Sequence, residues 1–183
     1  ICAFLAGVLL GALWGAIPGL FKALLNINEV ITCIMTNWIA ANLVTWWFDA
    51  HDAFKNSAEG GKVGYIIPLK NVGVVTPKWG MDTLFHGSQA NGGFWIACIL
   101  AIVMWVIMTK TTFGYELRAC GQNRHAAKYA GINDKKNIVL SMVIAGALAS
   151  AGGALYYLSG NTEFYWSTYM SLPSEGFNGI PVA

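Results

Sequence analysis

Few residues in this chain have the types and the spacing that catalysis or metal binding requires. Asp49, His51 and Asp52 lie close together, but one histidine beside two carboxylates is only a weak indication of a metal site. No nucleophile motif of the G-x-S-x-G kind occurs, and Gly60-Gly61-Lys62 has neither the spacing nor the Ser or Thr of a Walker A loop. The sequence therefore predicts no catalytic residue, no metal and no cofactor bound by this chain.

The cysteines and the basic residues exclude further classes. The cysteines have neither the spacing of a zinc site nor that of a disulfide framework, so we interpret all four as small apolar packing residues: Cys2, Cys33, Cys98 and Cys120. No run of basic residues is interleaved with aromatic ones, as binding to nucleic acid would favour. We therefore expect neither redox chemistry nor a nucleic-acid partner.

Three polar residues stand out because they lie in or beside apolar sequence. Asn37 and Asn42 fall inside an apolar stretch, where an amide without a partner costs several kcal/mol. Each should therefore face other helices or a wet cavity, either in an interhelical hydrogen bond or along the path of a solute. Glu29 opens the same stretch, where a carboxylate favours the positive end of a helix dipole. We keep Glu29, Asn37 and Asn42 as candidates for a solute path.

The elements that must position these residues are membrane helices. The chain is 56% hydrophobic and only 11% charged, with a mean hydropathy of +0.52, whereas soluble domains carry about 25% charged residues. A spanning helix needs about 20 apolar residues. The predicted spans are residues 1–20, 30–48, 93–109 and 138–158. We predict an all-α, polytopic transmembrane helix bundle, a single domain over residues 1–183 that we expect to be truncated at both ends.

The distribution of charge predicts an orientation. Residues 110–137 contain six basic residues against two acidic ones, and short loops rich in Lys and Arg stay in the cytoplasm. The loop 49–92 and the tail after residue 158 should then lie outside. Aromatic residues at 46–48, 94–95 and 156–157 fall at the predicted outer ends, as an interfacial belt requires.

Small residues recur on two of the predicted helices. In the first span glycines stand four residues apart, which places them on one face and lets another helix approach closely: Gly7, Gly11, Gly15 and Gly19. In the fourth span Ala145, Ala149 and Gly153 share a face, and Gly146 and Ser150 share a neighbouring one. The pattern indicates a bundle. Pro18 should kink or end the first helix, because it lacks an N–H group.

The polar segment 110–137 has structure signals of its own. Residues 116–129 contain good helix formers, and Gly131 stands where a glycine commonly ends a helix. Asn133 or Asp134 can cap the fourth spanning helix, since a short polar side chain satisfies free backbone N–H groups. We therefore expect a short cytoplasmic helix that is tied directly to a membrane helix.

A motif within this segment resembles a known family. Nine residues match in order the pattern T-x-x-G-x-x-x-R-A-x-G-x-N-x-x-A-A-x-x-x-G-I: Gly114, Arg118, Ala119, Gly121, Asn123, Ala126, Ala127, Gly131 and Ile132. This pattern is similar to the cytoplasmic coupling segment of bacterial ABC-importer permeases of the ribose and branched-chain amino-acid class. The stretches 28–37 and 176–183 resemble the nucleoside-uptake branch, although Cys33 and Thr36 stand where that branch more often has Thr and Leu.

The resemblance implies a multi-pass subunit of the bacterial plasma (inner) membrane that moves nucleosides or simple sugars inward by alternating access. It implies as partners a second permease subunit, an extracytoplasmic solute-binding protein and a cytoplasmic ATP-binding subunit, which binds and hydrolyses ATP in place of this chain. It also implies that residues 114–131 dock on that ATPase. The expected coupling residues are Gly114, Arg118, Gly121, Asn123, Arg124, Ala126, Ala127 and Gly131.

An ion-gradient-driven secondary transporter of a small polar solute is the alternative. Such a carrier is expected to place carboxylates or histidines inside the membrane for proton or sodium coupling. None lies in the middle of a predicted span, which favours the ATP-driven class.

Overall fold

The structure is a computed structural model that describes residues 2–51 and 92–159. Within these ranges the chain forms six α-helices and no strand, which confirms the predicted all-α fold class. The helices are α1 (Cys2–Leu25), α2 (Glu29–Ala50), α5 (Gly93–Lys110), α6 (Thr112–Gln122), α7 (Arg124–Tyr129) and α8 (Asp134–Leu158).

Four of these helices, α1, α2, α5 and α8, are long and apolar enough to cross a membrane. Each lies over one of the spans predicted from sequence, and each extends past it at the end near the polar segment. The extension is largest in α1 and α8, and α8 begins at Asp134 rather than at residue 138. Polar residues can continue a helix beyond the hydrocarbon layer, because the backbone hydrogen bonds are made within the helix itself.

Of the two effects predicted for Pro18, a kink or an end of the first helix, the second is wrong. The helix does not end there: Pro18 is buried inside it, and α1 continues to Leu25. The missing proline N–H group is tolerated in membrane helices, where neighbouring elements stabilise the freed backbone. The helix instead ends at Asn26, which has a φ of 53° and whose N–H donates to the Lys22 carbonyl over 3.1 Å, the left-handed cap that asparagine tolerates.

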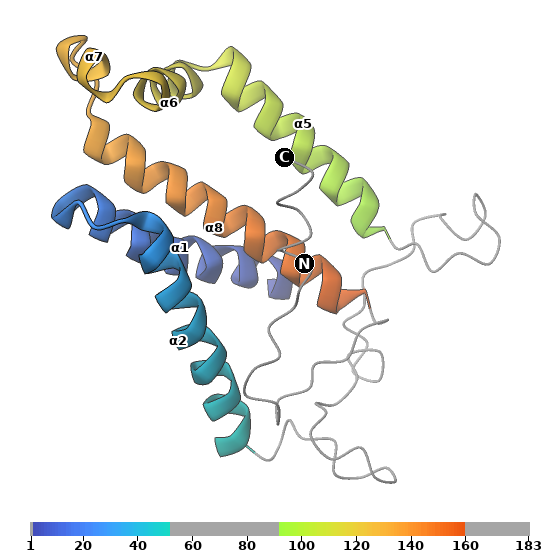
Figure 1. The fold of residues 1–183 in the computed structure, drawn as a ribbon. Coiled ribbons are helices and arrows are strands. Elements are labelled where there is room, and N and C mark those ends of the chain that lie inside the picture. The colour runs from blue at the N-terminus through green and yellow to red at the C-terminus, as the bar shows by residue number, and fades with distance from the viewer. Residues whose placement is uncertain (1, 52–91, 160–183) are drawn as a thin grey trace, which may run out of the picture.

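The closest packing in the described part of the bundle joins α1 and α8, which lie side by side and antiparallel (Figure 1). A Cβ atom on Gly15 would stand 2.6 Å from the Met142 carbonyl oxygen, and one on Gly11 would stand 2.7 Å from the Gly146 oxygen. These distances leave no room for a side chain. Near the other end the Ser150 hydroxyl donates to the Gly7 carbonyl over 2.5 Å. The glycine pattern thus builds a helix contact.

Only one of the two small-residue faces of α8 makes this contact. Gly146 and Ser150 lie against α1, whereas Ala145 and Ala149 are exposed and a Cβ on Gly153 would meet nothing within 4 Å. Sequence spacing showed both faces equally, and the structure assigns the contact to one of them.

The other two long helices pack less tightly. Helix α2 follows α1 after a turn of three residues, and Asn28 caps it by accepting a hydrogen bond from the Val30 N–H over 2.9 Å. Helix α5 approaches α8 at its far end, where a Cβ on Gly93 would lie 3.4 Å from Leu155. Between α5, α6 and α8 lies an apolar groove of about 510 Å³.

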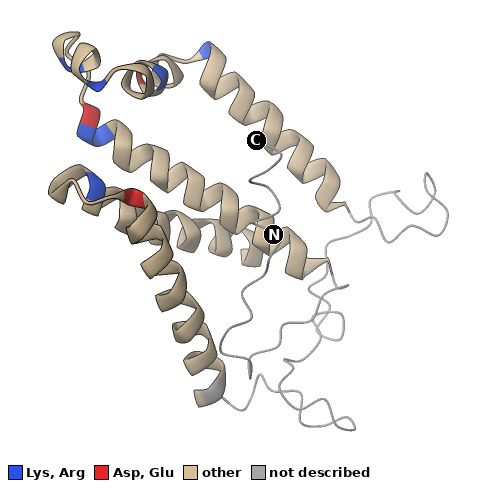
Figure 2. Ribbon diagram, viewed as in Figure 1, with Lys and Arg blue, Asp and Glu red and all other residues tan. Residues whose placement is uncertain are grey.

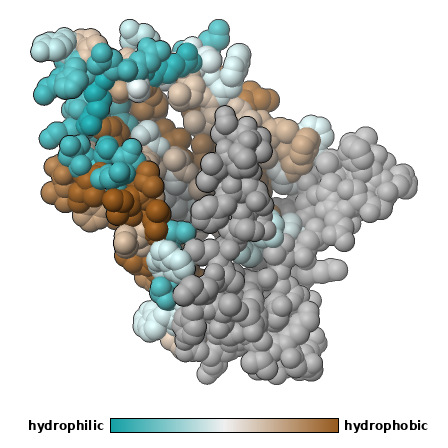
Figure 3. Space-filling view, in the orientation of Figure 1, coloured by the Kyte–Doolittle hydropathy of each residue, from teal (hydrophilic) through white to brown (hydrophobic). Residues whose placement is uncertain are grey.

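Charge and hydropathy are segregated along the bundle. Figure 2 shows the residues coloured as charged on the described helices gathered at the end where α1 and α5 finish and α8 begins. We call this the charged end, and it comprises Lys22, Glu29, Lys110 and residues 111–137. Elsewhere large apolar side chains are exposed, as the hydrophobic surfaces in Figure 3 illustrate. Lipid covers such surfaces in a membrane protein.

Candidate coupling site

The polar segment forms a helical bridge between two membrane helices at the charged end. It leaves α5 at Thr111, runs through α6 and α7, and enters α8 after Asn133 (Figure 1). A bridge of this kind can pass a displacement to both membrane helices only if its ends and its bends are fixed. The contacts at each junction show how they are fixed.

The junction with α5 is held by close backbone approach and by a cation. The Thr111 hydroxyl accepts a hydrogen bond from the Gly114 N–H over 3.2 Å and so caps α6. Gly114 is buried against α5, because a Cβ there would stand 2.6 Å from the Met108 oxygen. The Arg118 guanidinium donates to that same Met108 carbonyl. A cation is favourable at this position, because the last carbonyls of a helix carry partial negative charge.

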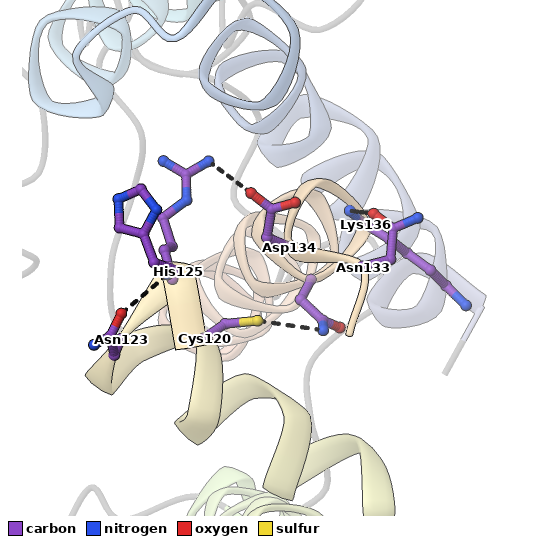
Figure 4. Close-up of polar contacts among 8 residues, drawn as sticks. Cys120, Asn123, His125, Asn133, Asp134 and Lys136 are labelled. Atoms are coloured by element: carbon purple, nitrogen blue, oxygen red, sulfur yellow. Dashed lines mark hydrogen bonds and ion pairs between the residues drawn. The ribbon is translucent and has the colours of Figure 1, made fainter. Parts of the chain in front are cut away.

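The middle of the bridge contains a break that the sequence did not predict. We expected one helix over residues 116–129, but the structure has two, separated at Asn123. The Asn123 backbone is extended, and its Oδ1 accepts hydrogen bonds from the N–H groups of His125 (3.0 Å) and Ala126 (3.1 Å; Figure 4). Asparagine competes well for backbone donors and is a preferred N-cap, so it ends α6 and starts α7.

The exit from α7 follows the prediction for Gly131. This glycine has a φ of 80°, its N–H donates to the Lys128 carbonyl, and the Ile132 N–H donates to the Ala127 carbonyl. These two bonds define a Schellman cap. Asn133 then caps α8 by accepting from the Lys136 N–H over 3.2 Å (Figure 4). The sequence allowed Asn133 or Asp134 in this role, and Asn133 fills it.

Two side-chain contacts join the bridge to the first turns of α8. Arg124 and Asp134 form an ion pair at 3.3 Å in a partly exposed position. Deeper in the structure, the Asn137 Nδ2 donates to the Glu116 Oε2 over 3.2 Å and lies 3.6 Å from the Cys120 Sγ. Sequence reasoning missed Asn137 and Glu116. The signals that could have found them were an amide at the start of an apolar helix and one of only two acids in a basic segment.

The eight expected coupling residues therefore divide into two groups. Six take part in the fold of the bridge through caps, close contacts, burial or ion pairs: Gly114, Arg118, Asn123, Arg124, Ala127 and Gly131. Ala127 in particular is only 3% exposed, so it packs within this chain. The other two, Gly121 and Ala126, are exposed, and a Cβ on Gly121 would meet nothing within 4 Å. Tyr115 and Tyr129, which sequence reasoning did not select, are exposed as well.

The three solute-path candidates lie on α2 but do not form one site. Glu29 pairs with Lys22 across the turn between α1 and α2. The Asn42 amide donates to the carbonyl of Trp38 in its own helix over 2.9 Å rather than to another helix. Asn37 is exposed. The hydroxyl groups of the buried Thr32 and Thr36 also donate locally, to the carbonyls of Asn28 and Thr32 four residues earlier in the chain.

The weak metal candidate falls mostly outside the described residues, which include His51 but neither Asp52 nor the side chain of Asp49. His51 stacks on Trp47 with ring centroids 4.4 Å apart. Among the residues that the structure describes, no three histidines, cysteines or acids are grouped to hold a metal ion.

Four apolar helices and a polar bridge between two of them define a multi-pass membrane protein. Residues 1–177 match the family described as the permease component of branched-chain amino acid transport systems, and the chain belongs to that family. The resemblance to ABC-importer permeases and the predicted location in the bacterial plasma (inner) membrane are thereby confirmed.

The chain is also similar to ABC transporter permeases that are named for nucleosides, guanosine and glucose. The chain is 40% identical to the nucleoside ABC transporter permease protein NupB of Lactococcus lactis, over 97% of this chain and 48% of the relative. It is 36% identical to the guanosine ABC transporter permease protein NupP of Bacillus subtilis, over 94% and 47%. It is 27% identical to the glucose ABC transporter permease protein TsgB13 of Haloferax volcanii, over 98% and 47%. No solved structure matches the chain.

The chain spans about half the length of the curated relatives that it matches.

Proposed function

We propose that this chain forms part of the permease subunit of an ABC importer for nucleosides or simple sugars. Alternating access, driven by a separate ATPase, moves the solute inward. The observation that carries the proposal is the bridge itself, which is fixed to α5 through Gly114 and Arg118 and to α8 through Arg124 and Asn137. A displacement of such a bridge moves both membrane helices, which is what a two-state transporter needs.

The names of the relatives favour nucleosides. Relatives that are 36–40% identical to this chain are named for nucleosides and guanosine, whereas relatives at 27–29% are named for nucleosides, glucose or galactose. We therefore place nucleosides first and simple sugars second. An extracytoplasmic binding protein would deliver the solute, and a second permease subunit would complete the pathway.

Uptake by the complete assembly tests the solute and the energy source together. We expect proteoliposomes that contain the full-length permease subunits, the ATPase and the binding protein to accumulate labelled nucleosides only when ATP reaches the ATPase. Uptake that continues without ATP and collapses when an ionophore removes the ion gradient would instead support the secondary transporter. Labelled glucose and galactose in parallel vesicles distinguish the two solute classes.

Docking of the bridge on the ATPase has its own test. Ala126 is exposed on α7, so the change Ala126→Trp adds bulk without disturbing the fold of the bridge. We expect this variant to lose most of the ATPase that copurifies with the permease. Ala50→Trp is the matched control, because Ala50 is also exposed but ends α2 at the opposite end of the bundle. Equal copurification by both variants would contradict docking through this face.

A further inference from the structure

Asn137 is the most deeply buried polar side chain in the described part of the molecule. It is 2% exposed and lies one turn into α8, directly beneath α6. Its Nδ2 donates to the Glu116 Oε2 over 3.2 Å and approaches the Cys120 Sγ at 3.6 Å. Figure 4 shows the Cys120 side chain pointing from α6 toward this contact.

Because the Asn137 amide is buried, it depends on the hydrogen-bond partners that surround it. An amide removed from water is destabilising unless it is hydrogen-bonded, and a bond to a charged acceptor is stronger than one to a neutral acceptor. Glu116 and Cys120 stand four residues apart, so they occupy the same face of α6. This face of α6 is therefore held in one register against α8.

The second link between the bridge and α8 is weaker. The side chains of Arg124 and Asp134 are 41% and 23% exposed, and exposed ion pairs contribute little because water and salt screen them. Of the two polar links to α8, the buried one therefore resists displacement more strongly.

Helix α8 can pass a displacement onward. Gly11 and Gly15 of α1 meet Gly146 and Met142 of α8 with no space for a side chain, and closely packed interfaces move as units because they cannot deform continuously. Contacts therefore run without a gap from α6 through Asn137 to α8, and from α8 to α1.

We propose that the hydrogen bond between Asn137 and Glu116 is the joint through which the bridge moves α8. Asn137 acts as a positioning residue, because it holds α8 against α6 through its contacts with Glu116 and Cys120. The proposal rests on the function proposed above, because the joint transmits a displacement to α8 only if an ATPase moves the bridge.

Exchanging the polarity of the pair tests the joint in the full-length importer in proteoliposomes. Asn137→Asp places two carboxylates together and removes the donor. Asn137→Asp combined with Glu116→Gln reverses the bond, since the Gln amide then donates to the Asp carboxylate. Glu116→Gln alone keeps an acceptor for Asn137. The readout is the number of solute molecules imported per ATP hydrolysed, with copurified ATPase measured beside it.

We expect Asn137→Asp to lower this ratio by about five- to tenfold, the lower range of allosteric couplings, while the ATPase still copurifies. The reversed pair should restore most of the wild-type ratio, and Glu116→Gln alone should retain most of it. Should Asn137→Asp fail to fold, Glu116→Ala removes the acceptor from the partly exposed side and should give the same loss. A variant with a lowered melting temperature but an unchanged ratio would overturn the proposal, as would a reversed pair no better than the single change.

The same measurements distinguish a failure of this proposal from a failure of the proposed function. A wild-type assembly that neither copurifies with an ATPase nor imports solute with ATP would contradict the proposed function. A wild-type assembly that imports normally, together with a fully coupled Asn137→Asp variant, would contradict only the joint.

Discussion

Single side chains decide where the polar bridge bends, and Asn123 is the clearest case. Its Oδ1 accepts from two backbone N–H groups at the start of α7, so Asn123→Ala leaves both without that acceptor. Loss of an N-cap costs about 1 kcal/mol, or about a fivefold change in local opening. We expect amide hydrogen exchange over residues 124–129 to accelerate by roughly that factor in the lipid-embedded protein.

Asn123→Asp is the control, since a carboxylate caps as well as an amide and should leave exchange near the wild-type rate. If Asn123→Ala exchanged no faster than Asn123→Asp, the cap would not hold α7.

Residue chemistry predicted part of the structure of this region, because Gly131 and Asn133 take the cap positions that their residue types favour. The position of Asn137 at the start of an apolar helix could have marked it, but its pairing with Glu116, 21 residues away, depends on the fold and could not be read from sequence.

Because of helix packing, replacing glycine by alanine should change the stability of the protein in opposite directions at two positions. Alanine generally stabilises a helix by about 1 kcal/mol relative to glycine. Gly152 is exposed and an added methyl group would meet nothing within 4 Å, so Gly152→Ala should leave the melting temperature unchanged or raise it. At Gly11 the added methyl would collide with Ser150 and Gly146, and overpacking costs about 1–3 kcal/mol.

We therefore expect Gly11→Ala to lower the melting temperature of the detergent-solubilised permease while Gly152→Ala does not. Equal shifts for the two variants would contradict the close contact between α1 and α8. Hydropathy predicted the long helices because the membrane requires about 20 apolar residues. It did not predict which face of α8 meets α1, since small residues occupy two adjacent faces and only three-dimensional packing distinguishes them.

For the whole molecule, the segregation of charge predicts how the bundle lies in the membrane. Lys110, Arg118, Arg124 and Lys128 all lie at the charged end, where the bridge joins α5 to α8. Because Lys and Arg in short connections are retained on the cytoplasmic side, the bridge should face the cytoplasm. Ala50, at the far end of α2, should then face the outside.

Thiol labelling checks this orientation directly. In a full-length permease whose native cysteines are replaced by serine, Tyr129→Cys presents a thiol at a side chain that is 94% exposed, and Ala50→Cys presents one at the opposite end. A membrane-impermeant maleimide should label Ala50→Cys in intact cells and Tyr129→Cys only in inside-out vesicles. The reverse labelling pattern would mean that the bridge faces the outside, where a cytoplasmic ATPase cannot reach it. That result would contradict the proposed docking as well. Docking of a cytoplasmic ATPase on the bridge therefore requires that the charged end face the cytoplasm.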